Sequence, residues 1–195
     1  MREGKIGTSL QKRRQSKKLL KKLKKKDRDS FIKAYDLFSD DIYRFIYFKV
    51  SDTEEAKDLT SIVFLKTWNY IQSKSVLEFR TLRALIYQIA RNSIIDHYRL
   101  QKKHLSLQNP EVVKKEKDQR SEDVIEKINV SFEYENLISS IKELKDEYQE
   151  VIIFRFIEEL SIKEISEIMG KNSGNIRVLI YRATRALKKI VQDSK

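Results

Sequence analysis

The stretch from Ser161 to Ala183 constrains the fold most, because its residues predict two short helices joined by a tight turn. Apolar residues recur at helical intervals in the first of these helices, at Ile162, Ile165, Ile168 and Met169. That spacing places them on one helix face. Ser161 and Glu164 have the spacing of a capping box at the start of this helix. Gly170 can adopt a left-handed backbone without a Cβ clash, which allows the turn that follows.

The second helix is predicted to begin at Asn172 or Ser173 and to be amphipathic. Its apolar stripe consists of Ile176, Leu179, Ile180, Ala183, Leu187 and Ile190. The opposite face carries amide and cationic side chains, at Asn175, Arg177, Arg182, Arg185, Lys188 and Lys189. This pattern is typical of a DNA-binding helix-turn-helix, whose second helix enters the major groove. The alternative is an ordinary helical hairpin with a solvated basic face.

Composition favours an all-helical protein and argues against several functional classes. The 195 residues include four Gly and one Pro and no Asn-Gly pair, so hairpin turns are not expected. The absence of Cys excludes disulfides and thiolate zinc sites, and with two His we expect no metal or cofactor. No run of 18 apolar residues and no signal peptide are found, so we expect a cytoplasmic protein without membrane insertion. No catalytic constellation or phosphate-binding Gly loop is recognisable, which argues against an enzyme.

The positive charge is concentrated at the N-terminus. The net charge is +12, and residues 1–26 hold 12 Lys or Arg against the single acid Glu3. The other 169 residues are therefore nearly neutral. Residues 1–26 have few apolar side chains, so we expect a mobile, disordered basic arm that touches nucleic acid or only aids solubility.

Apolar periodicity divides the rest of the chain into two small helical domains. The first domain spans residues 27–102 and contains three predicted helices, at 29–50, 52–72 and 81–102. The second spans residues 131–195 and ends in the helix-turn-helix. Residues 103–130 contain Pro110 and a mixed charge run, which predicts a flexible linker. The expected fold class is all-α, with two small domains joined by this linker.

Motifs in both domains resemble one protein family. The first domain contains Asp58-Leu59-Thr60, Val63-Phe64-Leu65-Lys66 with Trp68, Ile89-Ala90-Arg91-Asn92 and Asp96-His97-Tyr98-Arg99. These resemble region 2 of the extracytoplasmic-function (group IV) sigma factors of bacterial RNA polymerase, in the sigma-70 family. The stretch from Tyr148 to Ser161 resembles region 4 of the same family. One departure follows Thr60, where the family usually has Gln and then an acidic residue and this chain has Ser61 and Ile62.

The resemblance implies a promoter-specificity subunit that works by binding rather than by covalent catalysis. Core RNA polymerase would dock on the helix at 52–72, through Asp58, Leu59, Phe64, Leu65 and Trp68. The helix at 81–102 and the loop before it would contact and open the minus-10 element, through Phe79, Arg91, Asn92, Asp96 and Arg99. The helix-turn-helix would read the minus-35 element, through Ser173, Asn175, Arg177, Arg182 and Arg185. An anti-sigma factor is a further partner that the resemblance allows.

A stand-alone transcriptional regulator is the alternative function. In such a protein the N-terminal helices would form a dimerisation or effector module, and the helix-turn-helix alone would bind DNA. A regulator of this kind would bind its site tightly without polymerase.

Overall fold

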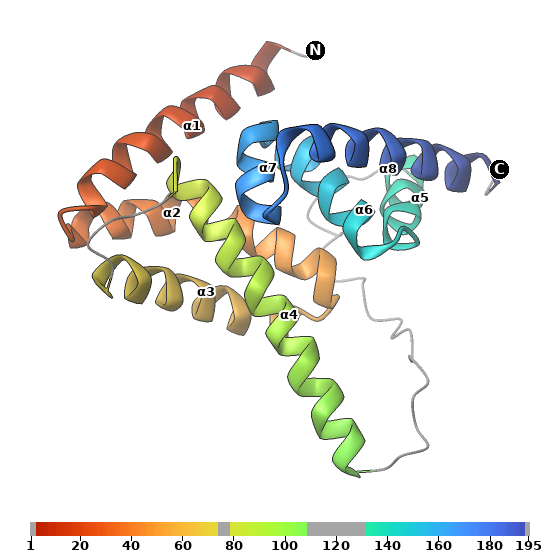
Figure 1. Ribbon diagram of the computed structural model, residues 1–195, viewed down its shortest axis with the longest axis horizontal. Helices are drawn as coiled ribbons and strands as arrows, with labels where there is room; N and C mark the ends of the chain where they lie inside the picture. The colour runs from red at the N-terminus through yellow and green to blue at the C-terminus, as the bar shows by residue number, and fades with distance from the viewer. Residues whose placement is uncertain (1–2, 74–78, 109–131, 194–195) are drawn as a thin grey trace.

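The computed structural model describes residues 3–73, 79–108 and 132–193, and every regular element in these ranges is a helix (Figure 1). The N-terminal part contains α1 (Glu3–Leu23), α2 (Arg28–Val50), α3 (Thr53–Ser73) and α4 (Leu82–Gln108). The C-terminal part contains α5 (Phe132–Lys142), α6 (Asp146–Ile152), the π-helix η2 (Ile153–Ile157), α7 (Ile162–Met169) and α8 (Ser173–Asp193). The prediction of an all-α protein is confirmed.

Helices α2, α3 and α4 pack against one another as the core of the N-terminal domain. Asp27 caps α2, because its carboxylate accepts a hydrogen bond from the Ser30 backbone N–H at 3.1 Å. The helix ends at Ser51, which has a left-handed backbone with φ 58°. Between these ends, one stripe of α2 is buried against α3 and α4, at Ala34, Phe38, Ile42, Phe45 and Ile46.

The N-terminal segment is a packed helix, which corrects the expectation of a mobile, disordered arm over residues 1–26. Helix α1 lies against α2 and α4 (Figure 1). Leu20 and Leu23 are buried in the common core, and the buried Ser16 hydroxyl accepts a hydrogen bond from the Arg83 backbone N–H at 2.9 Å. Ser16, Leu20 and Leu23 recur every three or four positions, so these three side chains fall on one helix face.

Helix α4 continues past the predicted boundary of the N-terminal domain. It extends to Gln108, so the first six residues of the predicted linker, 103–108, are helical. The remainder of the predicted linker falls outside the described residues. In Figure 1 the C-terminal half of α4 projects away from the other helices.

The predicted caps and turn of the helix-turn-helix are confirmed. The Ser161 hydroxyl accepts from the Glu164 backbone N–H at 3.3 Å, and the Glu164 carboxylate accepts from the Ser161 N–H at 3.0 Å. Gly170 ends α7 in the left-handed region, with φ 63°. The Asn172 side chain accepts from the Asn175 backbone N–H at 2.8 Å, which identifies Asn172 as the cap of α8. The inner side of α8 is buried, at Ile176, Leu179 and Ala183.

The two domains are packed against each other through α2 and α4 on one side and η2, α6 and α7 on the other. Three buried aromatic rings form the centre of this contact. Phe154 lies 5.0 Å from Phe45 and 5.7 Å from Tyr87, measured between ring centroids. Aromatic pairs at such distances stabilise a contact beyond the area they bury. The domains therefore share one apolar core in this arrangement.

Beside these rings, the buried carboxylate of Glu158 joins the two domains. It accepts a hydrogen bond from the Tyr87 hydroxyl and lies 3.4 Å from Arg44 Nε and 3.8 Å from an Arg83 terminal nitrogen. The Arg83 guanidinium also donates to the Glu158 backbone carbonyl. Burial raises the pKa of the Glu158 carboxyl, while Arg44 and the Tyr87 hydroxyl act in the opposite direction. Burial also raises the pKa of Tyr87 well above its ordinary value.

The Glu158 network predicts that the domains stay associated after the chain between them is cut. A site-specific protease sequence introduced between residues 109 and 131 allows this cut, and we expect the two fragments to co-elute in gel filtration. Glu158→Ala should separate them, because it leaves the Arg83 charge buried without its partner, a change that destabilises by about 3–5 kcal/mol. Glu159→Ala, at the exposed neighbouring carboxylate, should leave them together. Separation of the unmutated fragments would contradict the shared interface.

Candidate nucleic-acid interface

The outer face of α8 carries the predicted minus-35 residues, and it is open to solvent. Asn175, Arg177, Arg182 and Arg185 are exposed, and Ser173 is half-buried at the start of the helix. Within the described residues none of the three arginines forms an ion pair, although Arg177 donates to the Ser173 carbonyl at 3.4 Å. Exposed guanidinium groups that form no ion pair with a protein carboxylate are available to phosphates and to guanine edges.

Two large exposed side chains on this face were missed by the sequence analysis. Tyr181 is 63% exposed and Val178 is 47% exposed. The Arg185 guanidinium carbon lies 5.9 Å from the centre of the Tyr181 ring. Both residues fall outside the apolar stripe that contains Ile176 and Ala183. Their position among the polar and cationic side chains of the opposite face was the sequence signal that could have identified them. Exposed apolar groups on a recognition helix can contact thymine methyl groups.

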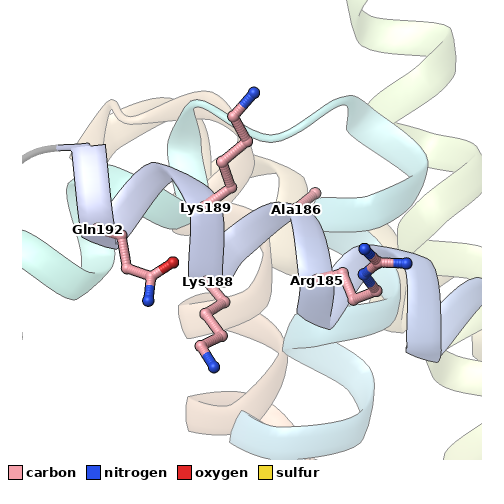
Figure 2. A pocket seen from close by; sticks show the side chains of 5 residues that line it. All are labelled: Arg185, Ala186, Lys188, Lys189 and Gln192. Atoms are coloured by element: carbon pink, nitrogen blue, oxygen red, sulfur yellow. The ribbon is translucent and has the colours of Figure 1, made fainter.

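A surface hollow lies toward the C-terminal end of α8 and has a cationic lining. Its residues are Arg185, Ala186, Lys188, Lys189 and Gln192. Figure 2 shows that Lys188 and Lys189 extend to opposite sides of the helix. The cationic surface of α8 therefore continues beyond the turns that hold Arg177 and Arg182. Amine and guanidinium groups in this arrangement suit phosphate contacts better than base edges.

Four of the five predicted minus-10 residues share one side of α4. Arg91, Asn92, Asp96 and Arg99 fall within an arc of about 140° at 100° per residue. Asn92, Asp96 and Arg99 are exposed, and Asp96 lies 3.8 Å from Lys66. Phe79 is apart from this group. It precedes α4 and packs against Tyr70, with ring centroids 6.1 Å apart. Since Arg99 lies about 25 Å along the helix from its first residue, these five form an extended surface and not one pocket.

In this arrangement the C-terminal domain occupies part of the α4 surface. Arg91 Nε pairs with Glu150 of α6 at 2.9 Å. Before α4, Arg80 pairs with Glu167 of α7 at 3.1 Å, and the Thr81 hydroxyl donates to Glu164 at 3.2 Å. Contact of Arg91 or Arg80 with a DNA phosphate therefore requires these bonds to the helix-turn-helix domain to break.

The predicted polymerase-docking residues divide between the surface and the core of α3. Leu65 is 60% exposed, Asp58 is exposed and Trp68 is half-buried. Leu59 and Phe64 are buried, and Phe64 packs against α2, where Tyr35 lies 4.7 Å from it between ring centroids. Their packing stabilises the domain, so they are not part of the exposed face.

Ile62 was treated in the sequence analysis only as a departure from the family pattern. It is 41% exposed and lies on the same face of α3 as Asp58 and Leu65, four residues after Asp58. We refer to Asp58, Ile62 and Leu65 as the α3 face. This face combines two exposed apolar side chains with one carboxylate, and exposed apolar groups of this kind mark protein contacts.

Other site classes find no support in the part of the chain that the structure describes. In these ranges no three His, Cys, Asp or Glu side chains are grouped so that they could hold a metal ion. Nor is any described helix both long and apolar enough to pass through a membrane.

Comparison with known proteins identifies both domains. Residues 34–104 match the family described as Sigma-70 region 2, and residues 134–187 match Sigma-70, region 4. The chain is 32% identical over 184 residues to the ECF RNA polymerase sigma factor SigW of Bacillus subtilis, covering 91% of this chain and 97% of SigW. It is 33% identical over 165 residues to the ECF sigma factor BldN of Streptomyces coelicolor, covering 85% of this chain and 61% of BldN.

The fold is also that of known sigma factors. The sigma factor RpoE of Bartonella quintana, solved in complex with the anti-sigma factor NepR, superposes with a TM-score of 0.66 at 18% identity, covering 85% of this chain and 98% of RpoE. CnrH, solved with the cytosolic domain of CnrY, gives 0.65 at 16% identity, covering 93% of this chain and 99% of CnrH. The family matches and the identity to SigW support the sigma-factor interpretation, and none of these comparisons favours a stand-alone regulator. The chain belongs to the extracytoplasmic-function sigma factors of bacterial RNA polymerase.

Proposed function

We propose that this sigma factor directs core RNA polymerase to promoters through three separate surfaces. The α3 face docks on core polymerase, the exposed side of α4 contacts and helps to open the minus-10 element, and the outer face of α8 reads the minus-35 element. The protein acts by binding. It stabilises unstacked bases with favourable contacts that offset an unstacking cost of a few kcal/mol per base.

The amphipathic division of α8 supports this proposal most directly. Its inner stripe is buried in the C-terminal domain, while Asn175, Arg177, Arg182 and Arg185 on its outer face are exposed. The N-terminal turns of a recognition helix enter the major groove, so Ser173, Asn175 and Arg177 are assigned to base edges. Arg182 and Arg185 lie further along and are assigned to phosphates, with Val178 beside a thymine methyl group.

The contacts between the domains have to change before promoter binding. Arg91 is paired with Glu150, and the Glu158 network holds α4 against the helix-turn-helix domain. We infer that binding to core polymerase separates the domains and frees α4 for the minus-10 element. An anti-sigma factor, as seen with RpoE, is proposed as the partner that opposes this step. The inferred location is the cytoplasm, where polymerase works.

The α3 face can be tested without disturbing the core. Leu65→Asp and Asp58→Arg should each weaken binding to bacterial core polymerase at least tenfold, because both side chains are exposed and neither supports the fold. Binding is measured by gel filtration and by fluorescence titration. The control is Asp193→Arg, which makes the same charge change as Asp58→Arg at an exposed position of α8. This variant should bind normally. Unchanged affinity of a folded Leu65→Asp variant would show that the α3 face is not the docking surface.

Substitutions of the two groups of arginines on α8 should affect promoter binding in different ways. Arg177→Ala should remove roughly 1–3 kcal/mol of discrimination and relax base preference at one or two minus-35 positions, because it is assigned to a guanine edge. Arg185→Ala should weaken binding to all promoters equally and lower the salt slope by about one unit. Transcription from a promoter library with a randomised minus-35 element measures both effects. If Arg177→Ala lowers yield without changing the preferred sequence, Arg177 contacts the DNA backbone instead.

A further inference from the structure

Helix α1 presents a cationic surface that the region 2 and region 4 functions do not use. It precedes residue 34, where the match to region 2 begins. Between Gln11 and Lys26 the sequence contains no acidic residue. Five exposed cations of α1 form what we name the α1 cationic face, consisting of Arg14, Lys17, Lys18, Lys21 and Lys22.

The α1 cationic face is held in a fixed orientation. The opposite side of the helix is anchored by the buried Leu20 and Leu23, by the hydrogen bond that Ser16 accepts from Arg83, and by the ion pair of Lys12 with Asp41 at 2.8 Å. Because these residues occupy one side of the helix, the cations are displayed on the other. Within the described residues none of the five forms an ion pair, so no carboxylate of the protein is bonded directly to these cations.

The contact of α1 with α4 fixes the direction in which this charge is displayed. Ser16 contacts the backbone of Arg83, the second residue of α4, so α1 lies next to the N-terminal end of that helix and the α1 cationic face is directed away from it. Its cations from Arg14 to Lys22 extend over about 12 Å of helix. Phosphates of one DNA strand follow one another about every 3.4 Å along the duplex axis, so this length matches about three of them.

We propose that the α1 cationic face binds the phosphate backbone of duplex DNA, as a DNA-binding surface additional to those of α4 and α8. Lysine-rich surfaces without base-reading groups give sequence-independent phosphate contacts. A protein partner fits less well, since lysine is depleted at protein interfaces and the described part of α1 exposes no large apolar side chain. An anionic membrane also fits less well, because the apolar side that would enter the lipid is buried against α2 and α4.

The experiment compares variants of the full chain on a duplex of unrelated sequence, without polymerase. The triple variant Arg14→Gln/Lys18→Gln/Lys21→Gln removes three cations of the α1 cationic face. Gln keeps a helix propensity close to that of Lys and Arg, so α1 is retained and circular dichroism is expected to match the wild type. The matched control is Lys57→Gln/Lys142→Gln/Lys145→Gln, which removes the same charge from exposed positions elsewhere.

We expect the α1 variant to bind at least tenfold more weakly at low salt and to lose two to three units from the slope of log affinity against log salt concentration, about 0.9 for each cation. The control should stay within about twofold of the wild type. The charge-preserving variant Lys18→Arg/Lys21→Arg should bind as the wild type does. Equal losses in the α1 variant and the control would overturn the proposal, because net charge alone would then explain the binding.

A parallel measurement uses vesicles of phosphatidylserine and phosphatidylcholine. The proposal expects no α1-dependent vesicle binding at the salt concentration that supports DNA binding. Vesicle binding that is lost in the α1 variant, together with unchanged duplex binding, would identify a membrane surface and refute the DNA assignment. Because the duplex contains no promoter and polymerase is absent, failure here leaves the minus-10 and minus-35 assignments untouched, and failure of those assignments leaves this result standing.

Discussion

The arrangement of the two domains depends on the contacts of the buried Glu158 carboxylate. A charged group in a protein interior is tolerated only where partners replace its lost hydration. Arg44, Arg83 and Tyr87 supply these partners, and all three belong to the N-terminal domain. The carboxylate belongs to the C-terminal domain, so separation of the domains removes its partners. The Glu158 carboxylate therefore keeps its hydrogen-bond and ion-pair partners only while the two domains are in contact.

The network extends beyond the interface and reaches α1. Arg44 also pairs with Asp41 at 2.8 Å, and Asp41 pairs in turn with Lys12 of α1. At the same time the Arg83 backbone N–H donates to Ser16 of α1. One residue of α4 thus contacts both the N-terminal helix and the C-terminal domain. Arg83 and Arg44 therefore help both to orient the α1 cationic face and to hold the C-terminal domain against α4.

The contact between the domains leaves part of the proposed DNA-binding surfaces exposed. The exposed half of α4 and the outer face of α8 are already accessible to DNA. Domain separation would release Arg80 from Glu167 and Arg91 from Glu150.

The sequence alone determined the local structures and the family. Ser161, Glu164 and Gly170 act within a few residues of one another, so the helix-turn-helix could be predicted from spacing, and its caps are confirmed. The amphipathic stripe of α8 likewise predicted that the amide and cationic side chains are exposed, although it did not identify Val178 and Tyr181. The motifs around Asp58 and Arg91 carried the resemblance to sigma factors that the region 2 match confirms. In each case the interacting residues are close in the sequence, so the spacing of residue types is enough to predict the interaction.

Tertiary structure decided everything that depends on distant partners. Leu20 and Leu23 became core residues only because α2 and α4 lie beside them, and the same sequence in isolation reads as a soluble basic arm. Phe64 is buried and Leu65 exposed because α2 covers one side of α3, which one-dimensional periodicity does not specify. Glu158 and Arg83 are 75 residues apart in the chain. Pairing over such a separation leaves no local pattern, so the closed contact between the domains is visible only in the folded protein.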